Sequence, residues 1–292
     1  MYPAPVKYEA PRSLDQAIAL LEKGKGEAKI LAGGQSLVPM LKLRFASPEM
    51  LVDINNISEL NFHKVEADGS IRIGALCRHE DLEKSALIKS SQPTLAAAAH
   101  LVADPIVRTR GTFVGSVCHA DPQGDWAATM LALDGYIVAQ GPNGRRNIAM
   151  KDFIAGPFQT TLNYNEIAIE AVIPAPKGTA FGGYLKLERR VGDFATASVA
   201  VGLDVQGGII TRAGVALGGV GGETIYVGDA PSILVGKTLT PELIAQVAKA
   251  AAADAKPKSD HRGSAEYKRH IVSVFVSRIL TNVLGQVAKK AA

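Results

Sequence analysis

The residues best suited to chemistry lie in two glycine-containing segments. The first is Leu31-Ala32-Gly33-Gly34-Gln35-Ser36-Leu37, which falls between an expected strand and an expected helix. Paired glycines let the backbone turn sharply and approach a ligand closely. The amides that follow, together with the start of the helix, form a site for phosphate oxygens, and Ser36 adds a hydroxyl. For an isolated Gly-Gly pair, however, an ordinary strand–helix turn is the better interpretation.

The second segment runs from Arg110 to Asp125. Thr112, Gly115 and Ser116 could surround a pyrophosphate, and an acidic side chain after them suits hydrogen bonding to ribose or flavin. Aspartate is also a common helix N-cap. Neither segment is a Walker loop or a G-x-G-x-x-G fingerprint. Two phosphate-type loops about 80 residues apart nevertheless predict a large dinucleotide held by two subdomains.

The cysteine and histidine content argues against a metal site in this chain. Two cysteines, Cys77 and Cys118, are too few for a disulfide framework, an iron–sulfur cluster or a structural zinc site. His79, His100 and His119 lack metal-ligand spacing, so we expect structural roles for them. We predict no metal ligand. The scarcity of cysteine favours a reducing, cytoplasmic compartment.

Apolar periodicity and capping residues predict the elements that position these segments. Ser13 and Gln16 form a capping box before an apolar stripe, and Gly24 closes that helix. Ser36 is expected to cap the helix after the first loop, and a turn at 142–144 predicts a hairpin. Expected helices cover 13–24, 36–43, 94–103, 125–133 and 264–287, with another from 240; expected strands cover 28–32, 50–54, 71–75, 136–140, 146–149, 166–173, 183–189, 198–205 and 209–217.

Length and composition are typical of a folded protein of two domains. The chain has 292 residues, of which 47% are hydrophobic and 21% charged, and domains average about 150 residues. Strands and helices mix without regular βαβ alternation, which favours an α+β fold over a doubly wound sheet. The segment 174–178, rich in proline, is the best linker candidate. No apolar stretch of about 18 residues predicts a transmembrane helix, and residues 1–8 do not resemble a signal peptide.

Positive charge is concentrated near the C-terminus. The net charge is +4, and residues 254–290 carry eight basic against three acidic side chains. These charges are interspersed with Ala, Val and Ile at helical spacing, which favours a solvated helix face over a docking surface for an acidic partner. Nucleic-acid binding is therefore not expected.

Taken in order along the chain, these segments resemble the FAD-binding medium subunit of molybdenum hydroxylases. This family includes the flavin domain of xanthine dehydrogenase and the medium chains of carbon monoxide, quinoline, nicotine and aldehyde dehydrogenases. The resemblance covers essentially the whole chain, from Tyr2-Pro3 through both loops and the strand at 51–54. It continues through 166–174 and 186–195, and it ends at 263–267.

The resemblance implies the fold in more detail. Residues 1–176 would form an FAD-binding domain of the vanillyl-alcohol-oxidase/p-cresol-methylhydroxylase type, with subdomains of about 1–55 and 56–176. Residues 177–292 would form a small α+β C-terminal domain, a three-stranded sheet with helices.

The resemblance also implies which residues contact FAD. The first loop would hold the pyrophosphate and the neighbouring sugar. In the second, Val114 stands where the family usually has a glycine. Lys186 would favour the anionic reduced flavin through its charge. Phe194 replaces a frequent tyrosine; its ring could gate access of the electron acceptor, or it could simply pack in the core. The implied cofactor-binding residues are Leu31, Ala32, Gly33, Gly34, Gln35, Ser36, Leu37, Thr112, Gly115, Ser116, Asp125, one of Ile167, Ala168 and Ile169, which would pack on the isoalloxazine ring, Lys186 and Phe194.

The resemblance implies an electron-transfer subunit rather than a self-sufficient enzyme, so no side chain of this chain needs to act as a catalytic acid or base. Its partners would be a small subunit with two 2Fe–2S clusters and a large subunit with the molybdopterin cofactor, in a dimer of heterotrimers. Substrate would be hydroxylated at molybdenum, and electrons would pass through the clusters and FAD to an external acceptor. Gln35 stands where carbon-monoxide-type subunits often have histidine, so an aldehyde or a nitrogen heterocycle is favoured as substrate over carbon monoxide.

Two other functions are compatible with the residues. A stand-alone FAD-dependent oxidase or dehydrogenase would need its own substrate pocket and commonly has a larger cap domain than the roughly 115 residues after the linker. A non-catalytic nucleotide-binding regulator would use the basic C-terminal region to contact a partner. Retention of FAD would exclude the regulator, and turnover of a small alcohol or amine by the chain alone would favour the oxidase.

Overall fold

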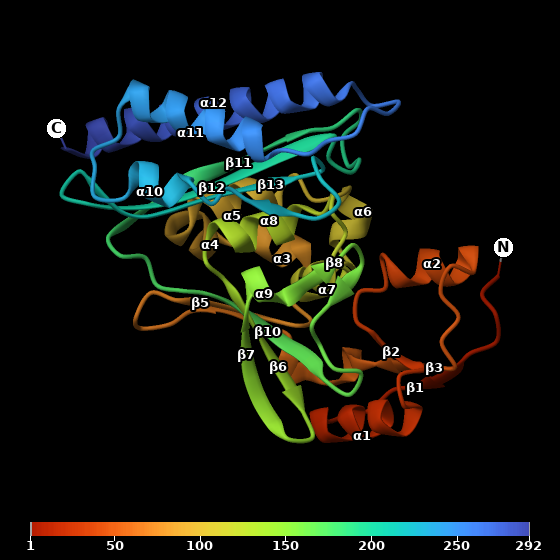
Figure 1. The fold of residues 1–292 in the computed structure, drawn as a ribbon. Coiled ribbons are helices and arrows are strands. Elements are labelled where there is room, and N and C mark those ends of the chain that lie inside the picture. Colours follow the sequence, from red (N-terminus) through yellow and green to blue (C-terminus); the bar gives the residue numbers. More distant parts are fainter. Residues whose placement is uncertain (1, 292) are drawn as a thin grey trace.

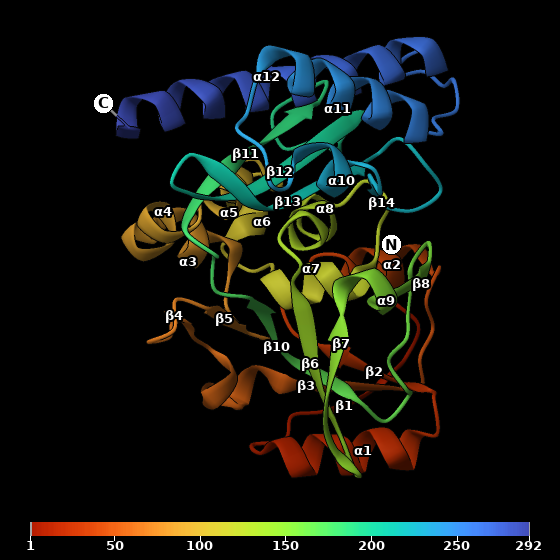
Figure 2. The same ribbon diagram turned by 60° about the vertical axis from the view of Figure 1, so that its left-hand side comes forward.

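A computed structural model describes residues 2–291. The described residues form sheets of three, five, four and two strands, connected by helices. Figures 1 and 2 show the three-stranded sheet at one end of the molecule and the four-stranded sheet, covered by two long helices, at the other. The five-stranded sheet lies between them. The α+β fold class is confirmed.

The first sheet is parallel, and it leads directly into the first glycine loop. Its strands lie in the order β1-β3-β2. Helix α1 (Leu14–Gly24) packs its apolar side on β2 and β3, and Ser13 caps it by accepting a hydrogen bond from the amide of Gln16. The loop ends in α2 (Leu37–Leu43). The strands are β1 (Lys7–Glu9), β2 (Ala28–Leu31) and β3 (Met50–Asp53).

The second sheet is antiparallel and is centred on one fully buried strand, β10. This strand pairs with β5 on one side and β6 on the other, and a bulge at Ile169 shifts its register with β6. The expected hairpin at 142–144 forms, with Gly144 at φ +105°. In the order β4-β5-β10-β6-β7, the strands are β4 (His63–Val65), β5 (Ile71–Gly74), β10 (Ile167–Ile173), β6 (Tyr136–Gly141) and β7 (Gly144–Ala149).

A layer of helices joins this sheet to the C-terminal sheet. Helix α7 contacts β5 and β10, α8 contacts β12 (Ala197–Gln206) and β13 (Ile209–Gly218), and the two helices contact each other. Every residue of α8 is buried, and Trp126 packs against Phe113 of α7 with ring centroids 4.6 Å apart. The elements of this middle region are η1 (Ile54–Asn56), η2 (Ser58–Leu60), α3 (His79–Lys84), α4 (Ala86–Ser91), α5 (Pro93–Ala99), α6 (Pro105–Arg108), α7 (Phe113–His119), α8 (Asp125–Ala132), α9 (Met150–Phe153), β8 (Ile154–Gly156) and β9 (Gln159–Thr160).

The C-terminal sheet lies between two helical layers. Its antiparallel strands follow chain order, with α12 on one face and α5 and α8 on the other. A Cβ atom at Gly214 would lie 2.2 Å from the carbonyl oxygen of Ala132, so glycine permits this close packing on α8. The sequence predicts three strands here, and a short fourth strand, β14, is added. The elements are β11 (Thr179–Leu187), β12 (Ala197–Gln206), β13 (Ile209–Gly218), β14 (Ile225–Tyr226), α10 (Ala230–Leu234), α11 (Pro241–Asp254) and α12 (Ala265–Ala291).

Helix α12 is long and apolar because one side of it forms core. By length and composition alone, Ala265–Lys290 could cross a membrane, with a mean hydropathy of 1.6 over a window of which 33% is buried. Val276, Leu280 and Val283 are fully buried, and the helix packs on α11, β11 and β12. Its apolar composition therefore follows from its packing on the C-terminal sheet.

Ser36 is at the N-cap position of α2, as predicted, but it has φ −103° and ψ −48° and its side chain makes no capping hydrogen bond. At α8 the N-cap is Gly124, and Asp125 is the first helical residue; its side chain accepts a hydrogen bond from Tyr184 of the C-terminal sheet. The helix predicted over 94–103 is also shorter, since α5 ends at Ala99.

Candidate cofactor-binding site

A cavity of about 860 Å³ brings the two glycine loops to one place. Its volume lies within the range of roughly 300–1,000 Å³ that is usual for ligand sites. Its walls come from both N-terminal sheets and from the loop after β11. Helices α2 and α7, which follow the two loops, lie in the same region of the molecule in both views (Figures 1 and 2).

The first loop fits a phosphate group because its backbone amides are free. Those of Gly34, Gln35 and Ser36 form no hydrogen bond with another residue of the described range 2–291. Gly34 has φ +73°, a left-handed conformation that favours glycine. At Gly33 a Cβ atom would lie 2.3 Å from the carbonyl oxygen of Arg110. Only glycine therefore lets the two loops meet here.

The second loop continues into helix α7. Thr112 is the N-cap, and its Oγ1 accepts a hydrogen bond from the amide of Gly115 at 3.2 Å. A Cβ atom at Gly115 would lie 2.5 Å from that hydroxyl oxygen. Val114 is buried within α7 and still contributes to the cavity lining, as Thr112, Gly115 and Ser116 do.

Asp125 lines the cavity and is held from behind by the C-terminal domain. Tyr184 Oη donates a hydrogen bond to Asp125 Oδ1 at 2.6 Å, and Lys186 Nζ lies 3.3 Å from the same oxygen. Lys186 Nζ also donates to the carbonyl of Leu101 at 2.5 Å and lies 3.2 Å from Glu188 Oε2. The Lys186 side chain is 1% exposed and is not part of the cavity lining. Lys186 therefore influences the cavity indirectly, through its ion pair with Asp125.

Burial dominates the ionisation of this group of residues. It raises the pKa of Asp125, and the opposing effects of Lys186 and Tyr184 lower it again in part. Burial, followed by the nearby Asp125 carboxylate, raises the pKa of Tyr184 well above its usual value, so the phenol remains a hydrogen-bond donor. Tyr184 and Lys186 thus hold the Asp125 side chain in a fixed orientation, from which it can form a hydrogen bond with a ligand in the cavity.

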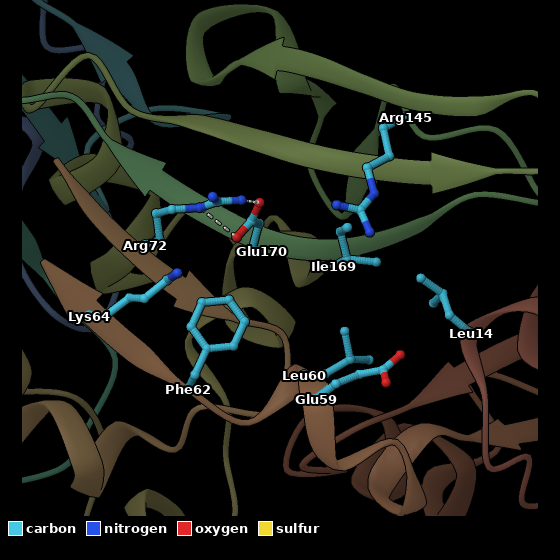
Figure 3. A pocket seen from close by; sticks show the side chains of 9 residues that line it. All are labelled: Leu14, Glu59, Leu60, Phe62, Lys64, Arg72, Arg145, Ile169 and Glu170. Atoms are coloured by element: carbon cyan, nitrogen blue, oxygen red, sulfur yellow. Dashed lines mark hydrogen bonds and ion pairs between the residues drawn. The ribbon is translucent and has the colours of Figure 1, made fainter. Parts of the chain in front are cut away.

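The bulge in β10 divides its candidate residues between two cavities. Ile167 and Ala168 line the large cavity, whereas Ile169 lines a second one of about 470 Å³. Figure 3 shows Ile169 in that second cavity with Arg72 and Glu170, whose side chains form an ion pair. Ile167 and Ala168 are therefore the members of this strand placed to contact a ligand in the large cavity.

Most of the residues singled out from the sequence line the large cavity. Ile169 and Lys186 lie outside it, as described above. Phe194 is 51% exposed, so it is not the core residue that the sequence left open as an alternative. The predicted residues in the lining are Leu31, Ala32, Gly33, Gly34, Gln35, Ser36, Leu37, Thr112, Gly115, Ser116, Asp125, Ile167, Ala168 and Phe194.

The cavity also has lining residues outside the predicted set. Phe158 has φ +60°, which is unusual for a bulky residue, and its ring lies 5.2 Å from that of His119. No sequence signal marks this conformation. Cys118 lines the cavity as well, and burial raises its pKa to about 12, so it presents a thiol rather than a thiolate.

His79 both supports the second loop and lines the cavity. Its Nδ1 accepts a hydrogen bond from Trp126 Nε1 at 3.0 Å, and its amide donates to the carbonyl of Gly111. A Cβ atom at Gly111 would lie 2.8 Å from the His79 ring. Burial, followed by the charge of Arg108, lowers the pKa of His79 to about 3, so the ring is neutral.

Comparisons with known proteins give this cavity a family context. Residues 4–176 match the family described as FAD binding domain in molybdopterin dehydrogenase, and residues 183–283 match the CO dehydrogenase flavoprotein C-terminal domain. The chain is 41% identical to the carbon monoxide dehydrogenase medium chain of Hydrogenophaga pseudoflava, over 96% of this chain and 97% of the relative. It is 36% identical to the glyceraldehyde dehydrogenase medium chain of Sulfolobus acidocaldarius, over 97% and 100%.

The fold agrees with these matches. A solved structure of carbon monoxide dehydrogenase from Hydrogenophaga pseudoflava superposes with a TM-score of 0.91 at 40% identity, over 96% of this chain and 98% of that chain. The free amides of the first loop, the close glycine contact between the loops and the apolar β10 wall suit an adenine-flavin dinucleotide. The chain belongs to the family of FAD-binding medium subunits of molybdenum hydroxylases, the flavoprotein components of oxidoreductase complexes.

Proposed function

We propose that this chain holds one FAD in the large cavity and passes electrons from 2Fe–2S clusters on a small subunit to an external acceptor. The observation that carries the proposal is the meeting of two glycine loops, one after strand β2 and one between helices α6 and α7, at the wall of one cavity. When bound there, FAD supplies exchange of one or two electrons, and the protein supplies position and electrostatics.

Each wall of the cavity has a separate task in this proposal. The amides of Gly34 and its neighbours, with the hydroxyls of Thr112 and Ser116, hold the pyrophosphate and sugar. Ile167 and Ala168 offer apolar surface to the flavin ring. The exposed ring of Phe194 lies where it can control the approach of an acceptor.

Asp125 and Lys186 form the electrostatic part of the site. Asp125 accepts a hydrogen bond from the cofactor, and Lys186 offsets its negative charge from behind. A cation behind Asp125 would favour the anionic reduced flavin. Because Lys186 lies outside the lining, we assign it an effect through Asp125 rather than direct contact.

The proposed partners are a small 2Fe–2S subunit and a large molybdopterin subunit, in a dimer of heterotrimers. The relatives are named as medium chains, which is consistent with further subunits. We place the FAD-binding domain at 1–176, with subdomains of about 1–55 and 56–176, and the C-terminal domain at 177–292; the boundary follows β10. The two free cysteines, Cys77 and Cys118, support a cytoplasmic location.

The substrate is expected to bind to another subunit. Relatives at 41%, 36% and 35% identity are named for carbon monoxide, glyceraldehyde and nicotine, respectively. The overall similarity of this subunit to its relatives therefore does not indicate the substrate of the complex. Our preference for an aldehyde or a nitrogen heterocycle depends on Gln35 alone, which lines the cavity.

The test is the flavin content of the full chain, purified alone and with its partner subunits. We expect a yellow protein that releases close to one FAD per chain on denaturation, identified by mass. Colourless protein that does not bind added FAD would contradict the proposal. Turnover of a small alcohol or amine by the chain alone would instead support a stand-alone oxidase.

A further inference from the structure

We propose that Asn55 and Arg78 form a bracket that fixes the two glycine loops relative to each other and thereby controls how tightly FAD is held. Neither side chain is part of the cavity lining, so both are positioning residues. The inference rests on the proposed function of the cavity.

Asn55 holds the first loop. Its Nδ2 donates a hydrogen bond to the carbonyl of Ala32 at 2.9 Å. The carboxamide is itself oriented, because Nδ2 also donates to Asp53 Oδ1 at 2.5 Å and the backbone amide of Asn55 donates to the same oxygen at 2.9 Å. Tyr8 Oη donates to the other carboxylate oxygen of Asp53 at 2.5 Å. The Asn55 side chain is thus anchored to strands β1 and β3.

Arg78 extends this contact to the second loop. Its Nη2 donates to Asn55 Oδ1 at 2.6 Å, and its Nη1 donates to the carbonyl of Arg110 at 2.5 Å. That carbonyl oxygen is the atom that a Cβ at Gly33 would meet at 2.3 Å. One guanidinium group therefore connects the anchored Asn55 to the point where the loops touch.

The bracket holds two carbonyl groups that immediately precede loop glycines, Gly33 and Gly111. Because a peptide unit is planar, fixing its carbonyl also fixes the direction of the next amide. The hydrogen bonds to Ala32 and Arg110 therefore orient the peptide planes on both sides of the contact between the loops. We infer that without them each loop could turn independently. The two glycine loops, which together form the proposed phosphate cradle, would then lose their preorganisation for the pyrophosphate.

The shape of the guanidinium group, not its charge alone, is what this geometry uses. Arginine presents several donors in a rigid plane and can serve two acceptors at once, whereas lysine is a point charge on a flexible chain. Arg78 also places a positive charge behind the loops, which would favour an anionic ligand by itself. Substitution of Arg78 by lysine separates the two effects.

The experiment measures the rate of FAD release from the full chain, followed by the recovery of flavin fluorescence. The variants are Arg78→Met, Arg78→Lys, Asn55→Ala and the Asn55→Ala/Arg78→Met double variant. We expect each single variant to release FAD about tenfold faster, equivalent to the loss of one or two hydrogen bonds. The double variant should be no faster than the faster single variant, because both break the same connection.

Arg269→Met is the matched control. Arg269 Nε also donates to a backbone carbonyl, that of Ala255 at 3.2 Å, but in the C-terminal domain. This variant should release FAD at the wild-type rate.

A second readout distinguishes a damaged cradle from a damaged fold. The chain is freed of flavin and titrated with ADP, which carries the pyrophosphate, and with riboflavin, which lacks it. The bracket variants should bind ADP about tenfold more weakly and riboflavin as the wild type does. An equal loss for both ligands would overturn the proposal.

Other outcomes would overturn it as well. They are a wild-type release rate in Arg78→Lys, additive effects in the double variant, or an unchanged rate in Asn55→Ala. If Arg78→Met fails to fold, Asn55→Ala and Arg78→Lys still decide the matter. Wild-type protein that holds no FAD would refute the proposed function itself, which is a distinguishable result.

Discussion

Gly33 and Gly34 are adjacent, yet they are needed for different reasons. At Gly33 the obstacle to a side chain is the Arg110 backbone, which cannot move without separating the loops. At Gly34 a Cβ atom would lie 3.1 Å from Leu31 Cδ1 and 3.2 Å from Val38 Cγ2, and the positive φ of +73° adds strain. Gly34 therefore offers the milder way to disturb the cradle.

Gly34→Val is expected to abolish FAD retention while leaving the chain folded. A β-branched residue at positive φ must change the backbone there, and the change misdirects the free amides of the loop. Flavin content and circular dichroism measure the two effects. Gly228→Ala is the control, because a Cβ at Gly228 has nothing within 4 Å. Normal flavin content in Gly34→Val would argue against the assigned cradle.

His79 is expected to make stability depend on pH. Its pKa falls from 6.5 to about 3 on folding, so the unfolded chain takes up a proton that the folded chain excludes. The stability contributed by this group is therefore full above pH 6.5 and is lost as the pH falls toward 3. Replacing His79 by glutamine removes this dependence, so the stability difference between wild type and variant should shrink as the pH falls. Denaturant melts at several pH values measure it, and parallel profiles would contradict the assignment.

The sequence identifies residues of the cavity lining well where the residue type itself is the signal. Both glycine loops and Asp125 are of this kind. Residues whose place in the site depends on their depth in the fold or on a neighbouring residue are harder to predict. Lys186 is on the expected strand but lies behind Asp125. Ile169 is displaced because a bulge breaks the two-residue alternation of β10. Phe158 reaches the cavity through a backbone conformation that its residue type does not indicate.

Among elements, long periodic segments are the predictable ones. Helices α1 and α11 begin where the sequence predicts, at the N-caps Ser13 and Thr240, and the β6–β7 hairpin forms where its turn residues predict. The short helices α3, α4, α6 and α7 were missed because four to seven residues carry little periodicity. Strand β1 was missed for another reason: it pairs with β3, and nothing local marks it.

Helix α12 can be stabilised at an exposed glycine. Gly285 lies within this helix, and a Cβ atom there has nothing within 4 Å. Gly285→Ala should raise the stability of the chain by about 1 kcal/mol, because glycine has poor helix propensity. Ala288→Gly, at another exposed position of the same helix, should lower it by a similar amount. Thermal melts test both, and equal melting temperatures would contradict the expectation.

At the scale of the whole molecule, the C-terminal sheet and the N-terminal region are closely packed. Gly202 and Gly214 face Ala132 of α8, and Arg212 donates a hydrogen bond to the carbonyl of Ala132 at 3.0 Å. The sequence indicates a linker and two domains. It does not indicate this contact, because the glycines of β12 and β13 have no local structural reason to be there.

Gly214→Ala is expected to destabilise the chain by about 1–3 kcal/mol through overpacking. The added Cβ would lie 2.2 Å from the carbonyl oxygen of Ala132. Neither atom can move away by rotation of a side chain, so the backbone itself would have to shift. Denaturant unfolding measures the loss, with Gly228→Ala as a neutral control. A stability equal to that of the wild type would show that the C-terminal sheet can shift on α8 without cost.

The complete burial of α8 has a consequence for synthesis of the protein. Part of its apolar surface is covered only when β12 and β13 pack on it, and these strands leave the ribosome after α8. Until then, the nascent chain presents an unshielded hydrophobic helix beside the newly formed loops. A chain terminated early, before these strands are made, should therefore be captured by chaperones or precipitate rather than accumulate as a free flavin carrier.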